Sequence, residues 1–251
     1  QQLYHFKSYS SWHRESNTYN EENRNLVLDY FRQVDGAIGR LVEAAGDDVV
    51  TILLSDHGMG AAHQFVILNN WLLKAGFLRL KSNLPTHLKA ALFQNGFTLV
   101  SIHQLADSLH LAKRAEYMGL YSLDKLMKLV FLSFADVDWS RSRAYSYGRH
   151  LGTIYLNVRG REPAGIVERG SEYEDVREEI IAALPSFTDP DTGQPVVGRV
   201  ARREEIYSGP YLDRAPDLIL WPRLETDIFF GLSDFGSNRM LEPTYRYSGM
   251  H

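Results

Sequence analysis

The sequence contains no cysteine, and this absence excludes three kinds of chemistry from its 251 residues. Disulfide bonds, cysteine-based zinc sites and thiol nucleophiles all require the missing side chain. Any bound metal ion must therefore be held by histidine, aspartate, glutamate or hydroxyl oxygens. The compartment is not fixed by the lack of cysteine, because a secreted bacterial protein can also lack it.

Long apolar runs are also missing. No segment reaches the roughly 20 apolar residues that a membrane-spanning helix needs, since the longest candidate, residues 126–135, is interrupted by Lys128 and Ser133. No signal peptide is visible, although the chain begins with Gln1 rather than methionine, which leaves room for an upstream segment. We therefore expect no membrane span and a cytoplasmic protein.

An excess of basic charge is absent too. The chain has 27 Lys and Arg against 31 Asp and Glu, a formal net charge of −4, so no nucleic-acid partner is expected. Its 44% hydrophobic and 23% charged residues are ordinary for a globular protein, which excludes disorder and collagen-like repeats. Nothing in the sequence indicates an oligomeric state.

The first half of the chain has the pattern of an α/β fold. Residues 20–45 carry apolar side chains at spacings of three and four, which predicts a helix, and Gly46 is a typical C-terminal cap. Residues 49–54 then form an unbroken apolar, β-branched run, which predicts a strand buried on both faces. Helix, short turn and buried strand together indicate a mostly parallel sheet covered by helices.

Further elements follow from the same criteria. Residues 82–135 have helical periodicity, so we expect a mostly helical insertion there. The other predicted elements are helices within 65–80, ended by Gly76, and at 173–184, and strands at 153–158, 196–200 and 218–221.

Asp56 and His57 are the most informative pair in the chain. They follow the predicted strand directly, and ligands of open α/β sheets lie beyond the carboxyl ends of strands. Gly58 and Gly60 let the backbone turn tightly beside a bound group. A carboxylate next to an imidazole suits Zn²⁺ or Mn²⁺. An isolated Asp-His pair is more often a helix cap and a loop histidine, but the strand and the two glycines favour a metal site.

Residues 50–59, Val-Thr-Ile-Leu-Leu-Ser-Asp-His-Gly-Met, resemble the late metal-binding motif of the alkaline phosphatase superfamily. The nearest branch is the type I phosphodiesterase/nucleotide pyrophosphatase-like group. The final Ser-Gly-Met-His, ending at His251, resembles the last metal-ligand histidine of that family. Further similar segments occur in the family's order, at 69–78, 138–145, 154–162, 207–211 and 215–219.

The resemblance implies an alkaline phosphatase-like three-layer α/β/α sandwich, with a mostly parallel central sheet and a helical cap insertion at 82–135. Residues 1–251 would form the later part of that catalytic domain. Two divalent metal ions, Zn or Mn, are implied, with Asp56 and His57 holding one and His251 holding the second. Such a pair neutralises phosphate oxygens and stabilises both the attacking and the leaving oxygen.

One part of the family pattern is not found. The nucleophile, a Thr or Ser that forms a covalent intermediate, lies in the family's N-terminal half, so we expect it upstream of Gln1 and expect these 251 residues alone to be inactive. His5 lies near the place of another metal-ligand histidine. Its aspartate partner would be position 1, which is Gln, so His5 stays unassigned.

The predicted function is metal-dependent hydrolysis of phosphodiesters or nucleotide pyrophosphates, with a small-molecule phosphoester or nucleotide as substrate. A phosphomutase, a phosphomonoesterase or a sulfatase of the same superfamily is the first alternative. A pseudoenzyme or binding module that keeps the fold and one incomplete metal site is the second.

Other polar residues have two interpretations each. His63 and His150 lie in loops and are either site residues or ordinary loop histidines. Arg159 and Arg161 follow a strand and either clamp phosphate or form a solvated basic turn. Asp217 precedes a strand and is interpreted as structural. Tyrosines that either stack on a nucleobase or pack at a rim are Tyr207, Tyr211, Tyr245 and Tyr247.

Overall fold

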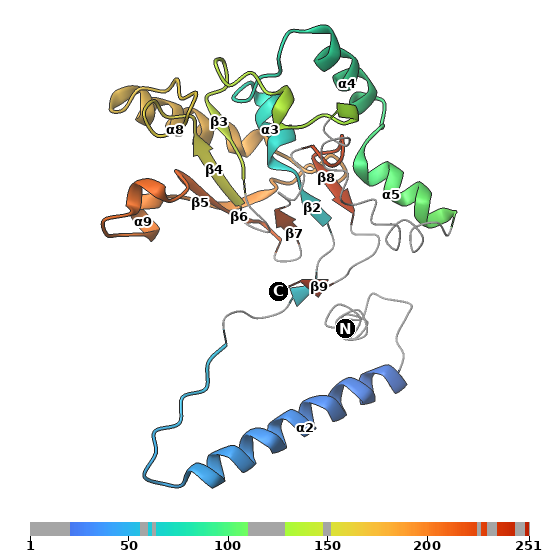
Figure 1. Ribbon diagram of the computed structural model, residues 1–251, viewed down its shortest axis with the longest axis vertical. Helices are drawn as coiled ribbons and strands as arrows, with labels where there is room; N and C mark the ends of the chain where they lie inside the picture. Colours follow the sequence, from blue (N-terminus) through green and yellow to red (C-terminus); the bar gives the residue numbers. More distant parts are fainter. Residues whose placement is uncertain are drawn as a thin grey trace. The chain divides into compact units, whose positions relative to one another are not determined.

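The computed structural model describes eight stretches of the chain, and they are mixed α/β (Figure 1). These stretches are residues 21–55, 60–61, 64–109, 129–147, 152–224, 227–229, 235–243 and 249–250. The chain divides into two compact units. The first is Gln1–His63 with Pro243–His251, and the second is Gln64–Glu242.

In the first unit, the helix predicted at 20–45 is confirmed as α2 (Glu21–Ala45). Gly46 follows it with φ at 81°, a left-handed conformation that glycine adopts without strain, and its amide donates to the carbonyl of Val42. The unit also contains β1 (Gly60–Ala61), which pairs antiparallel with β9 (Gly249–Met250).

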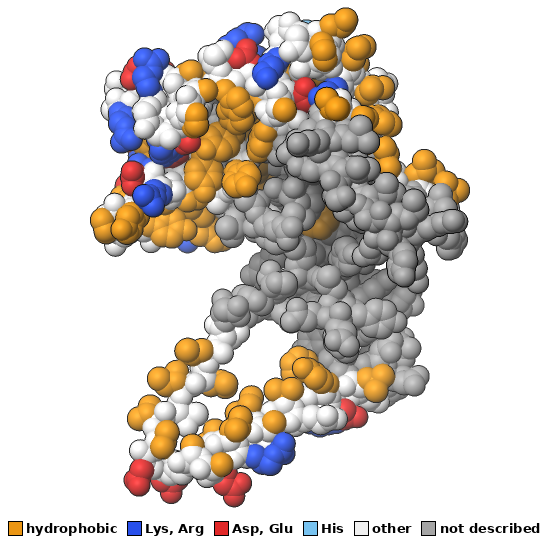
Figure 2. Space-filling model, viewed as in Figure 1, with side chains coloured by type: hydrophobic (Ala, Val, Ile, Leu, Met, Phe, Trp, Pro, Cys, Tyr) orange, Lys and Arg blue, Asp and Glu red, His pale blue; other side chains and the backbone are white. Residues whose placement is uncertain are grey.

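The prediction of a strand at residues 49–54 is wrong, because the structure has no strand there. Val50, Leu53 and Leu54 are 86%, 78% and 84% exposed, and Figure 2 shows apolar side chains on the surface along α2 and the segment after it. A strand that is apolar on both faces needs neighbouring strands and covering helices. Within the described stretches of this unit, the segment has neither.

The second unit contains two sheets, and they differ from the predicted mostly parallel sheet. The order β3-β4-β6-β5 is antiparallel throughout, and β2–β7 is a parallel pair in the order β7-β2-β8. β5 is an edge strand of the antiparallel sheet, and it is exposed at Gly198 and Arg199. The strands are β2 (Gln64–Val66), β3 (Ala144–Tyr145), β4 (Gly152–Leu156), β5 (Val197–Arg202), β6 (Leu218–Pro222), β7 (Asp227–Phe229) and β8 (Leu241–Pro243).

The predicted helix at 65–80 proves to be strand β2 followed by α3, which ends at Gly76 with φ at 82°. The predicted helix at 173–184 is confirmed as α8, and α4 and α5 lie inside the predicted insertion at 82–135. Residues 110–128 of that insertion are outside the described stretches. The helices are α3 (Leu68–Ala75), α4 (Leu84–Gln94), α5 (Leu99–Ser108), α8 (Ser171–Ala183) and α9 (Arg203–Ile206), with 3-10 turns η2 (Phe134–Asp136), η3 (Leu184–Ser186) and η4 (Leu212–Arg214).

One buried cluster joins the helices to the antiparallel sheet. Trp71 on α3 stacks on Phe187, with ring centroids 5.6 Å apart. Ile154 on β4 and Ile180 on α8 are fully buried in the same cluster, so the sheet and α8 share one core. In the described part of the chain, no helix is both long and apolar enough to cross a membrane.

Candidate functional site

The predicted metal ligands Asp56, His57 and His251 lie outside the described residues. Ser55, the last described residue before the gap, directly precedes Asp56, β1 begins three residues after His57, and β9 ends one residue before His251. These two strands pair directly, with Gly60 opposite Met250. The segments that lead to the predicted ligands, far apart in the sequence, therefore lie side by side at this pair.

Other predicted site residues are also outside the described stretches, namely His5, His63, His150, Tyr245 and Tyr247. Among the residues that are described, no group of three or more His, Cys, Asp or Glu side chains could hold a metal ion. The described polar chemistry is concentrated instead around one buried carboxylate of the second unit.

Asp217 is this carboxylate, and it lies fully buried immediately before β6. Arg161 donates to both of its oxygens, at 2.8 Å and 2.6 Å. The Tyr173 hydroxyl and the Leu156 amide donate to one oxygen each, at 2.6 Å and 2.7 Å, and Arg203 adds a bond of 3.2 Å. Both oxygens are thus occupied by protein donors, which supports the interpretation of Asp217 as a structural residue.

Two of the groups that contact Asp217, Tyr173 and Arg161, do not change protonation near neutral pH. Burial raises the pKa of Tyr173, and its hydrogen bond to Asp217 raises it further. Burial by itself would lower the pKa of Arg161, but the hydrogen bond and charge of Asp217 more than offset this and raise it overall. Tyr173 is therefore a neutral phenol and Arg161 a permanent cation, so this network is a fixed electrostatic scaffold rather than an acid–base pair.

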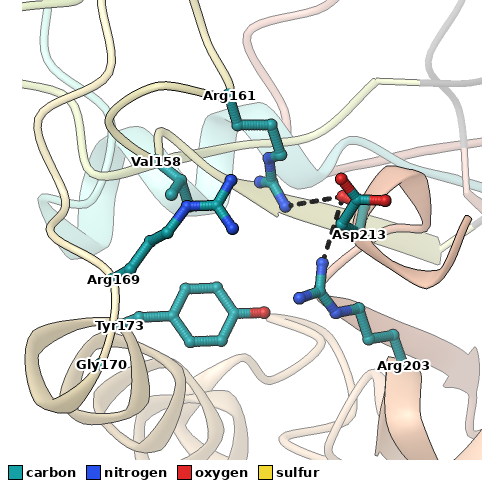
Figure 3. Close-up of a pocket in the computed structure, with 7 residues that line it drawn as sticks. All are labelled: Val158, Arg161, Arg169, Gly170, Tyr173, Arg203 and Asp213. Carbon is teal, nitrogen blue, oxygen red and sulfur yellow. Dashed lines mark hydrogen bonds between the residues drawn. The ribbon is translucent and has the colours of Figure 1, made fainter. Parts of the chain in front are cut away.

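A pocket of about 130 Å³ opens beside this network (Figure 3). Three guanidinium groups converge on it, from Arg161 after β4, Arg169 before α8 and Arg203 at the start of α9. Its lining consists of Val158, Arg161, Arg169, Gly170, Tyr173, Arg203 and Asp213. Sequence reasoning missed this cluster, because its arginines come from separate segments and form no linear motif.

The remaining candidates have structural roles or lie on the surface. Arg159 pairs with Glu168 at 2.7 Å and is 63% exposed, which is the solvated turn that one interpretation predicted. Asn157, two residues before Arg159, was not among the predicted site residues; it is buried and donates to three backbone carbonyls, so it stabilises the turn after β4. Tyr207 and Tyr211 are both exposed, at 46% and 68%.

Comparison with known proteins gives one finding. The family described as type I phosphodiesterase / nucleotide pyrophosphatase matches residues 9–251, which is nearly the whole chain. No curated protein and no solved structure matches it.

Proposed function

Because the chain belongs to the type I phosphodiesterase/nucleotide pyrophosphatase family, we propose that it serves metal-dependent hydrolysis of phosphodiesters or nucleotide pyrophosphates. The family match over residues 9–251 is the observation that carries this proposal. The substrate would be a small phosphoester or a nucleotide.

The metal site is proposed to contain Asp56 and His57 at one divalent cation and His251 at a second. Carboxylate and imidazole donors fit Zn²⁺ and Mn²⁺, and the pairing of β1 with β9 supports a site that uses both segments. Two such cations would supply charge neutralisation of the phosphate oxygens during the reaction. The proposal includes a covalent Thr or Ser intermediate, whose hydroxyl is not assigned to any residue of this sequence.

The fold proposal is an α/β/α sandwich with residues 82–135 as a helical cap insertion. Helices α4 and α5 lie within this range and support its helical character. The cap would exclude water and contribute to the choice of substrate.

Activity in the full-length protein tests the function. Hydrolysis of bis(p-nitrophenyl) phosphate should disappear with a chelator and return with Zn²⁺ or Mn²⁺. His57→Ala should lower turnover by about 100-fold or more, because it removes a metal ligand and its charge stabilisation. The matched control is His87→Ala, an exposed histidine on α4, which should retain wild-type turnover.

Wild-type turnover in His57→Ala would refute the site. A preference for phosphate monoesters or sulfate esters over the diester, measured on the same panel, would favour the other members of the superfamily. The 251-residue chain alone should show no turnover, and chelator-sensitive hydrolysis by that chain would contradict the expectation that its nucleophile lies elsewhere.

A further inference from the structure

The arginine-lined pocket beside Asp217 contains hydrogen-bond donors that the protein does not use. Arg161 is fully occupied. Its Nε donates to Glu162, its Nη1 to Asp217 and to the carbonyl of Asp213, and its Nη2 to Asp217 and to the carbonyl of Leu156. All five of its N–H groups are thus accounted for. Arg161 therefore contributes positive charge to the pocket but no free donor.

The other two arginines differ from it. Arg203 donates through Nε to the Glu204 carboxylate and through Nη1 to the backbone carbonyl of Asp213 and the carboxylate of Asp217, while its Nη2 has no acceptor among the described residues. Arg169 has no hydrogen bond or ion pair within the described stretches. Its neighbour Glu168 is paired with Arg159 instead.

Figure 3 shows how these donors lie. Arg169 and Arg203 extend their guanidinium groups into the same pocket from different sides, with the ring of Tyr173 beneath them. Asp217 is shared between Arg161 and Arg203. The carboxylate of Asp213 also lines the pocket, yet it makes no ion pair within the described residues. Cations that face each other repel, and an anion between them would relieve this repulsion.

We propose that this pocket binds a single phosphate group between Arg169 and Arg203. Guanidinium N–H edges match the oxygens of phosphate, and charge-assisted bonds of this kind are the strong ones. A volume of about 130 Å³ is large enough for one such group. Gly170 lines the pocket as the N-cap of α8 and has no side chain to block the approach. The source is free orthophosphate or the phosphate of a nucleotide, and the pocket does not depend on the proposed hydrolase site.

Calorimetric titration of the full-length protein with orthophosphate tests the pocket, at constant ionic strength and with a chelator present. Arg169→Gln should weaken phosphate binding about tenfold or more, because it removes a charge-assisted donor pair. Arg169 is exposed and makes no described bond, so this variant should unfold at the wild-type temperature in the absence of phosphate. The matched control is Arg159→Gln, another exposed arginine, which should bind as the wild type does.

Two further arms identify the ligand and its site. Tighter binding of adenosine monophosphate than of orthophosphate would assign the group to a nucleotide, and equal or weaker binding would assign it to free phosphate. Unchanged phosphate affinity of Arg169→Gln in the presence of the chelator would overturn the pocket proposal, and weaker binding by His57→Ala in a parallel titration without the chelator would then place the phosphate at the proposed metal site. Absence of saturable phosphate binding by the wild type would overturn it as well. Neither result would refute the metal-dependent activity of the full-length protein.

Discussion

Replacing Asp217 with asparagine tests whether the buried network stabilises the second unit. Asp217→Asn keeps the shape but removes the charge that two arginines share. The asparagine amide can be oriented in two ways, and in both its NH₂ group faces hydrogen-bond donors. In the position of Oδ2 it meets Leu156 and Arg161. In the position of Oδ1 it meets Tyr173, Arg161 and Arg203. Breaking a buried pair by changing one partner typically costs about 3–5 kcal/mol. Because Asp217 is fully buried and Arg161 is only 14% exposed, we expect a loss within that range.

Urea unfolding followed by tryptophan fluorescence measures this loss as a difference in the free energy of unfolding. The matched control is Asp213→Asn, a nearby exposed aspartate whose side chain makes no ion pair within the described stretches. It should change stability by less than about 0.5 kcal/mol. A loss below about 1 kcal/mol for Asp217→Asn would refute the reasoning, since it would mean that the two arginines find other counter-charges or that water reaches them.

Two further predictions concern the same unit. Burial would raise the pKa of Glu204, but hydrogen bonds from Arg177 and Arg203 lower this pKa overall. The ionised Glu204 therefore stabilises the fold above the unfolded pKa of about 4.3, and this contribution to stability is lost as the pH falls through the lower pKa of the folded state. Urea unfolding between pH 7 and pH 3 should show a smaller loss in Glu204→Gln, and identical pH profiles would contradict the assignment. Gly152→Ala should destabilise by about 1–3 kcal/mol, because a Cβ would clash with the Leu220 carbonyl and approach Phe229. Gly39→Ala, where nothing lies within 4 Å, is its control, and an equal effect of both substitutions on the urea midpoint would disprove the close packing.

The elements that the sequence predicted well are those that local pattern decides. The helix that became α2 and its stop at Gly46 depend on spacing and on one glycine, and both are confirmed. The strand at 49–54 was predicted from its apolar content, but a strand exists only where other strands pair with it, and the described residues supply none. The direction of strands β5 and β6 likewise depends on tertiary contacts and not on their composition.

The candidate sites differ in the same way. Asp56 and His57 are adjacent, so a motif was visible without any structure. The pocket arginines are far apart along the chain, and only folding brings Arg161, Arg169 and Arg203 together. Asp217 was interpreted correctly as structural from its place before a strand, but none of its partners was predicted from sequence.

The metal content of the full-length protein, measured by mass spectrometry after exhaustive dialysis, tests the central claim most directly. The account predicts about two divalent ions per chain in the wild type and about one in His57→Ala, since one ligand set is broken. His87→Ala should retain the wild-type content. Equal metal content in the wild type and in His57→Ala, or no bound metal in either, would contradict the assignment of Asp56 and His57 as ligands.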